Sequence, residues 1–127
     1  MSVNINELQA IINDLRRSTS NIQGISIVSA EGLTICSNIR SIADEEKVAA
    51  MSATLLSLGL NICDSFNKGL NESVFVKGTD GYILLTDINK RIVIALVTKS
   101  DIKIGVLLWE MEKVKQRISE IFTFNSC

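Results

Sequence analysis

The 127-residue chain contains no histidine, which removes the usual base of serine and cysteine nucleophiles and the commonest ligand of zinc and copper. It also lacks the loops GxxxxGK[ST] and GxGxxG, so nucleotide binding through those devices is excluded. Two acids, Asp80 and Asp87, stand at the ends of predicted strands, where turn-forming aspartate is common. The sequence therefore predicts a protein that is not an enzyme, with no catalytic, cofactor-binding or metal-binding residues.

Cysteine is also scarce, and Cys36, Cys63 and Cys127 lie far apart without a CxxC pair. This spacing argues against a disulfide framework or a zinc site and favours a reducing compartment. The N-terminus does not resemble a signal peptide. The longest uncharged run, residues 48–63, falls short of the roughly 20 residues that a bilayer span needs. We expect a cytoplasmic protein with no membrane span.

The charge balance gives no sign of a nucleic-acid partner. Thirteen basic residues stand against 14 acidic ones, for a net charge of −1. Nucleic-acid binding depends on clustered cations, and the densest basic run is Lys113, Lys115 and Arg117. With 46% apolar and 21% charged residues the composition is that of a folded chain, and its length predicts a single domain over residues 1–127.

Hydrophobic periodicity predicts three helices and five strands in the order α-β-β-α-β-β-β-α. Asn4 followed by Glu7 indicates a capped start for the first helix, and Ser41 to Asp44 read as the cap of the second. Two glycines in residues 78–81 are typical of a turn between strands. The predicted helices cover residues 5–18, about 44–66 and 101–122, and the strands cover residues 25–29, 33–37, 73–77, 82–88 and 91–98.

The strand pattern also predicts how the sheet is ordered. Residues 92–97 and 83–85 are apolar on both faces, which is typical of strands in the middle of a covered sheet. Residues 74–76 form a short run next to Lys77, as expected of an edge strand. The chain should therefore be α/β in the α+β sense, with a single-layer antiparallel five-stranded sheet in the order 2-1-5-4-3. The second helix should cover one face, the first and third helices the other, and the third strand should keep an unpaired edge.

The second helix carries two apolar stripes where docking on a sheet needs one. We assign the stripe of Val48, Met51, Leu55, Leu58 and Ile62 to the sheet. The other stripe should then be covered by a second copy of the chain or, alternatively, by a loop of the same chain. A symmetric dimer would also join the open edges of the third strands. The predicted dimer interface is Ala49, Ala53, Leu56, Leu60, Cys63, Val74, Phe75 and Val76.

Four further residues are candidates for binding another partner. Lys47, Thr54 and Asn61 form the only polar band on the second helix. Trp109, next to Glu110 and Glu112, fits either packing at the rim of the core or an anchor for a partner, because tryptophan is enriched at binding hot spots.

The segment at residues 22–37, IQGISIVSAEGLTICS, resembles the opening signature of the roadblock (dynein light chain) family. The shared pattern is a glycine, an apolar strand, a Ser-x-[Asp/Glu]-Gly turn and a strand of small residues, with Glu31 where the family more often has aspartate. The small residues of the second helix, Gly81 ahead of Tyr82-Ile83-Leu84-Leu85, and Gly105 in the last helix are also similar. The resemblance covers about residues 5–121 and is strongest to stand-alone prokaryotic members.

The resemblance implies a homodimer joined through the second helix and the third strand. It also implies a non-enzymatic scaffold that binds or regulates a small Ras-like GTPase, with an effect on GTP hydrolysis as one form of regulation. Two alternatives stay open: a small-molecule sensor of the PAS or GAF type, and a purely structural platform similar to longin-like scaffolds. A sensor needs a cavity with convergent polar groups, whereas here aromatic residues are only 5% and the central strands are aliphatic.

Overall fold

A computed structural model of the chain describes residues 4–19, 21–39, 42–90, 92–99 and 102–125. The predicted order of helices and strands is confirmed, and β1 begins earlier than expected, at Ile22. The predicted cap at Ser41 lies outside the described residues. The elements are α1 (Ile5–Ser18), β1 (Ile22–Ser29), β2 (Thr34–Asn38), α2 (Ile42–Ser65), β3 (Ser73–Gly78), β4 (Gly81–Asp87), β5 (Ile92–Thr98) and α3 (Ile104–Asn125).

The first helix forms as its sequence predicts. The side-chain oxygen of Asn4 accepts a hydrogen bond from the backbone amide of Glu7 at 3.2 Å, and the Asn4 amide group donates to the Glu7 carboxylate at 3.1 Å. The first of these bonds satisfies a backbone donor that the first turn of a helix leaves free, and the second holds the two side chains together. The buried stripe of α1 follows at helical spacing and consists of Leu8, Ile11, Ile12 and Leu15.

The sheet is antiparallel and has the predicted order β2-β1-β5-β4-β3. Its centre is β5, which is buried on both faces. Ile94 and Leu96 belong to the core beneath α1 and α3, while Val93 and Ala95 belong to the core beneath α2. Because successive side chains of a strand point to opposite faces, the apolar run of β5 contributes to both cores.

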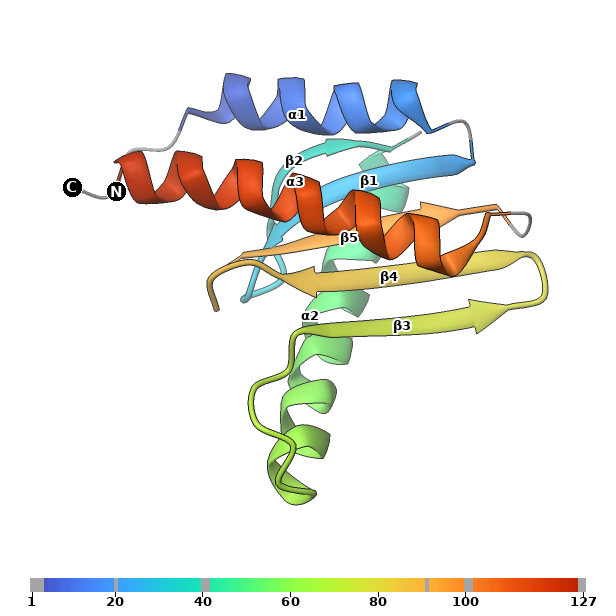
Figure 1. The fold of residues 1–127 in the computed structure, drawn as a ribbon, viewed down its shortest axis with the longest axis vertical. Coiled ribbons are helices and arrows are strands. Elements are labelled where there is room, and N and C mark those ends of the chain that lie inside the picture. The colour runs from blue at the N-terminus through green and yellow to red at the C-terminus, as the bar shows by residue number, and fades with distance from the viewer. Residues whose placement is uncertain (1–3, 20, 40–41, 91, 100–101, 126–127) are drawn as a thin grey trace.

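The helices cover the two faces unequally (Figure 1). Helices α1 and α3 pack side by side on one face, and α2 crosses the strands on the other. The core under α1 and α3 is extensive, whereas the buried cluster under α2 is small and consists of Leu56, Leu85, Val93 and Ala95. Much of the apolar surface of α2 is therefore not used within the chain.

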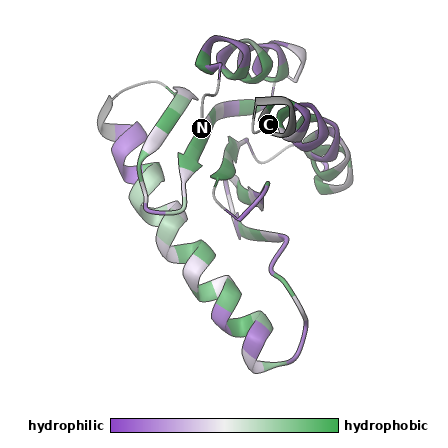
Figure 2. Ribbon diagram, turned by 90° about the vertical axis from the view of Figure 1, so that its left-hand side faces the viewer, coloured by the Kyte–Doolittle hydropathy of each residue, from purple (hydrophilic) through white to green (hydrophobic). Residues whose placement is uncertain are grey.

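The C-terminal half of α2 extends past β3 and away from the body of the protein (Figures 1 and 2). The helix ends where Asn67 takes a positive φ of 56° and the amide of Lys68 donates to the Cys63 carbonyl at 2.8 Å. This bond pattern terminates a helix with its last carbonyls satisfied. The extended half is therefore regular helix up to its end.

Residues 78–81 form the predicted turn between β3 and β4, and Gly81 is required there. Its φ is +145°, and a Cβ at this position would lie 2.0 Å from the carbonyl oxygen of Thr98. Any other residue would push β4 away from the end of β5. The glycine therefore permits the close contact that aligns β4 with the central strand.

One stretch of α2, Asp44–Ser65, is long and apolar enough to cross a membrane by length and composition alone. Only 17% of its most apolar 18-residue window is buried within the chain. Core helices of globular proteins can pass the same test, and one face of α2 packs on the sheet. Packing on the sheet therefore accounts for the apolar residues on one face of α2 and leaves those on its opposite face without a contact in the described part of the chain.

Candidate functional site

Helix α2 has one face on the sheet and another in solvent, and the sequence-based assignment of the two stripes is wrong for most of their residues. Ala49, Ser52 and Leu56 are the buried residues, with exposed fractions of 2%, 3% and 8%. The stripe that we assigned to the sheet instead contains the exposed residues Met51, Leu58 and Ile62. Val48 and Leu55 of that stripe do pack, half-buried, against the core beneath α2, so the prediction is wrong for Met51, Leu58 and Ile62 and for the buried Ala49 and Leu56.

The reason is steric. At Gly59, a Cβ would lie 2.5 Å from Nδ2 of Asn71 and 2.8 Å from Cγ2 of Val74. The small residues of α2 therefore let the helix approach its own sheet and the segment before β3. The prediction instead placed two of the small residues, Ala49 and Ala53, in the contact with a second copy.

The eight residues of the predicted dimer interface consequently divide into three groups. Ala49 and Leu56 are buried within the chain, which contradicts their assignment to an exposed stripe. Ala53, Cys63 and Val74 are half-buried. Leu60, Phe75 and Val76 remain accessible, with exposed fractions of 46%, 53% and 46%.

The exposed apolar face of α2 borders an uncovered part of the sheet, and Met51 and Leu55 are its residues nearest to that part. We call Met51, Leu55, Leu58 and Ile62 the α2 stripe. Next to it, β3, β4 and β5 present a row of paired residues, Val76, Ile83 and Val97. Val76 and Ile83 are 46% and 37% exposed because α2 crosses the sheet to one side of them. The stripe and the row together make an apolar corner.

A groove of about 770 Å³ lies in this corner. Its apolar lining includes Val48, Met51 and Leu55 of α2 and Ile83 and Val97 of the sheet. Three cations, Arg16, Lys47 and Lys99, and one acid, Asp44, also line it.

The corner adjoins the free edge of the sheet. β3 pairs only with β4 and ends the strand order, which confirms the predicted open edge. Its Phe75 packs against Tyr82 with ring centroids 6.5 Å apart, on the face opposite α2. The edge therefore has apolar side chains on both faces.

The predicted partner-binding residues do not all lie together. Lys47, Thr54 and Asn61 are exposed on α2, as predicted, and Lys47 borders the groove. Trp109 is 62% exposed on α3, on the other face of the sheet, with Nζ of Lys113 4.0 Å from its ring centroid. Trp109 is therefore not part of the α2 surface.

The titratable groups of the described residues form no recognisable reactive centre. Burial raises the pKa of the Cys36 thiol to about 11, so this cysteine is not a thiolate at neutral pH. Asp87 accepts a hydrogen bond from the Lys90 amide at 2.9 Å in a turn, as its position in the sequence predicts. Among the described residues, no group of three or more acids or cysteines is placed to hold a metal ion. The corner itself combines an apolar lining with the charged side chains of Arg16, Lys47, Lys99 and Asp44.

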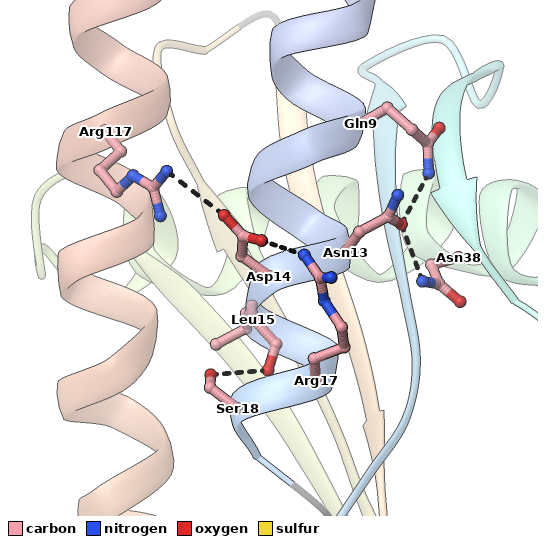
Figure 3. Close-up of polar contacts among 8 residues, drawn as sticks. All are labelled: Gln9, Asn13, Asp14, Leu15, Arg17, Ser18, Asn38 and Arg117. Carbon is pink, nitrogen blue, oxygen red and sulfur yellow. Dashed lines mark hydrogen bonds and ion pairs between the residues drawn. The ribbon is translucent and has the colours of Figure 1, made fainter.

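Sequence analysis missed a polar row on α1 that contacts β2 (Figure 3). Gln9 and Asn13 share a hydrogen bond of 3.0 Å, and Asn13 also accepts from the Asn38 side chain at 2.8 Å. Arg16 donates to the carbonyl of Asn38 at 3.1 Å. The spacing of Gln9, Asn13 and Arg16 on one helical face was the available signal.

Comparison with known proteins gives this fold a family. Residues 8–98 match the profile of the Roadblock/LC7 domain. MglB of Myxococcus xanthus aligns with a TM-score of 0.88 and 14% identity, over 97% of this chain and 92% of that one. A Roadblock/LC7 domain from Streptomyces avermitilis aligns with a TM-score of 0.85 and 16% identity, over 91% of this chain and 97% of that one.

A relative in sequence is the uncharacterized protein MJ1340 of Methanocaldococcus jannaschii. It is 25% identical over 104 residues, which cover 82% of this chain and 90% of the relative. At their low identities the solved structures establish the shared fold, and the profile match establishes the family. The resemblance in residues 22–37 is thereby confirmed, and the chain belongs to the Roadblock/LC7 family.

Proposed function

We propose that this Roadblock/LC7 protein is a non-enzymatic scaffold that works as a homodimer joined through α2 and β3. One observation carries the proposal: Met51, Leu58 and Ile62 are each more than half exposed on one face of α2. That face lies beside an unpaired strand edge. A contiguous exposed apolar surface marks an association site, and an open strand edge is a template for pairing with another chain.

A two-fold arrangement would use both features at once. If β3 paired with β3 of a second copy, the extended half of α2 would lie over the sheet of that copy. Leu60 and Cys63, on the sheet-facing side of α2, would then cover the open row of the second copy, which contains Val76 and Ile83. The two α2 stripes would pack against each other, and the groove would be filled. Each copy would contribute the same surface, as a closed symmetric dimer requires.

We further propose that the dimer binds a small Ras-like GTPase in the cytoplasm and modulates its GTP hydrolysis. Membership of the Roadblock/LC7 family supports this role through the resemblance described above. The exposed polar band of Lys47, Thr54 and Asn61 is a candidate contact. On α2 the band faces away from the sheet and runs beside the α2 stripe, and Lys47 also lines the groove.

The mass of the protein in solution tests the dimer. We expect light scattering at micromolar concentration to give twice the chain mass of 13.9 kDa. A mass of one chain under these conditions would overturn the dimer.

Nucleotide-dependent binding tests the GTPase. A Ras-like GTPase encoded in the same genome would be loaded with GDP or with a non-hydrolysable GTP analogue and passed over the immobilised protein. We expect retention of the GTP form, weakened by Lys47→Glu and unchanged by the matched control Lys68→Glu, which lies beyond the end of α2. Equal retention of both forms, or of neither, would reduce the protein to a general scaffold.

A second candidate function, small-molecule sensing, is favoured by the groove. Its volume of about 770 Å³ is in the range of ligand pockets. A metabolite that raises the melting temperature and converts dimers to monomers would support this function over the first. If the second copy of the chain fills the groove, we expect no metabolite to have this effect.

A further inference from the structure

The two edge strands of the sheet, β2 and β3, differ in the contacts that they make with the rest of the chain. At the β2 edge, the side-chain amide of Gln9 donates to the carbonyl oxygen of Ser37 at 2.9 Å. The guanidinium of Arg16 donates to the carbonyl oxygen of Asn38 at 3.1 Å. Helix α1 thus provides hydrogen-bond partners for backbone groups at the end of an edge strand.

The contacts between α1 and β2 form a connected set. Asn13 lies between the two donors, accepting from Gln9 at 3.0 Å and from the Asn38 side chain at 2.8 Å. Arg16 also donates to the side-chain oxygen of Asn38. From α2, on the other face of the sheet, Glu45 accepts a hydrogen bond from the Ser37 hydroxyl. The end of β2 is therefore held from both sides.

The β2 edge is also short and irregular. The strand has five residues, and its register with β1 shifts between Ile27 and Val28. Short, irregular and covered edges are the ways in which proteins avoid pairing with other chains. At the opposite edge, β3 has six residues in unbroken register with β4, and the hydrogen bonds described for its residues run to β4.

We propose that Gln9, Asn13 and Arg16 close the β2 edge, so that a second copy can add only at β3 and the assembly stops at two copies. The inference rests on the proposed dimer. Pairing β3 with β3 uses one edge of each copy and leaves both β2 edges at the ends of a continuous sheet. If those edges were open, dimers would join end to end and the contact would not close on itself. Residues on α1 therefore limit an assembly whose interface lies on α2 and β3.

The test removes the polar contacts of Gln9 and Asn13 while keeping the bulk of their side chains, and it leaves Arg16, which also lines the groove, in place. In Gln9→Met/Asn13→Leu the stems still pack, and neither residue lines the groove. The matched control Asp14→Leu/Arg17→Met makes the same kind of change on the other flank of α1, where Asp14 pairs with Arg17 and with Arg117 of α3.

Sedimentation velocity over a rising concentration series gives the readout. We expect the wild type and the control to show no species above two copies, and Gln9→Met/Asn13→Leu to form larger species that grow with concentration. A folded Gln9→Met/Asn13→Leu that keeps the wild-type size distribution would overturn the proposal. If circular dichroism shows that this double variant does not fold, Gln9→Met and Asn13→Leu are measured singly. Wild-type behaviour in both would likewise overturn it.

A third variant separates this inference from the proposed dimer. Adding Leu58→Asp to Gln9→Met/Asn13→Leu should block the α2 surface and leave only the β2 edge, so that growth ends at two copies. If the wild type is itself a monomer, the proposed dimer fails. In that case Gln9→Met/Asn13→Leu alone should give two copies and nothing larger, and a monomeric variant would reject the edge proposal too.

Discussion

Leu56 and Leu58 stand two positions apart on α2, yet the first is 8% exposed and the second is 53% exposed. Leu56 packs with Leu85, Val93 and Ala95 in the small core beneath the helix. Leu58 points away from the sheet as part of the α2 stripe. A substitution at Leu56 therefore tests the fold, and the same substitution at Leu58 tests the proposed interface.

The substitution Leu58→Asp should dissociate the dimer and leave the fold intact, because it places a charge in the middle of the α2 stripe without entering the core. We expect light scattering to give the mass of one chain while circular dichroism stays that of the wild type. A dimer of unchanged affinity would place the interface elsewhere.

The substitution Leu56→Asp should instead unfold the protein. Replacing a buried leucine with alanine already costs about 2–5 kcal/mol, and a carboxylate adds the cost of burying a charge. We expect loss of the cooperative thermal transition, or a large fall in its midpoint. A stably folded monomer would mean that Leu56 faces solvent, contrary to the structure.

The substitution Gly59→Ala should destabilise the chain although alanine favours helix. The new Cβ would lie 2.8 Å from Val74 and 2.5 Å from the side chain of Asn71, which is 5% exposed and has little room to move. Crowding of this kind typically costs about 1–3 kcal/mol, against a gain of about 1 kcal/mol in helix propensity.

Denaturant unfolding measures the balance for Gly59→Ala. Ser57→Ala, on the exposed polar side of the same helix, is the control and should be neutral or slightly stabilising. If Gly59→Ala gained as much stability as the control, the contact with Val74 and Asn71 would be looser than described.

Sequence patterns were sufficient for the sheet because β5 is apolar at consecutive positions, and only a central strand covered on both faces requires that. The orientation of α2 could not be obtained in the same way. Both of its stripes are apolar, so periodicity alone does not say which one faces the sheet. Steric fit at Gly59, which involves Val74 and Asn71 far along the chain, decides it.

The polar row on α1 escaped prediction for a related reason. A helix face made of Gln9, Asn13 and Arg16 is typical of one in contact with water. Whether these side chains bond to the sheet depends on where β2 ends. That position follows from the pairing of β2 with β1, in which Asn38 lies opposite Ile25. A single sequence does not distinguish a polar row in water from one that contacts a strand edge.

The pH dependence of stability should show a contribution from Cys36. Burial raises the pKa of this thiol from 9.0 to about 11, so the unfolded chain loses the proton first as the pH rises. The unfolded state then binds fewer protons than the folded state, and the free energy of unfolding falls between about pH 9 and about pH 11, by roughly 2 kcal/mol. Denaturant unfolding of the wild type and of Cys36→Ala across this range isolates the contribution, since other groups titrate equally in both. Equal slopes in the two proteins would contradict it.

The substitution Asn4→Ala should lower stability by about 1 kcal/mol, because it removes the acceptor for the amide of Glu7 at the start of α1. Helix α1 packs on β1, β2 and α3, so fraying of its first turn reaches the core at Leu8. Asn6→Ala is the matched control: it changes the same residue type in the same exposed turn but does not touch the cap, and helix propensity makes it neutral or slightly favourable. Thermal unfolding of both variants separates the two effects, and equal midpoints for Asn4→Ala and Asn6→Ala would show that the cap contributes nothing to stability in solution.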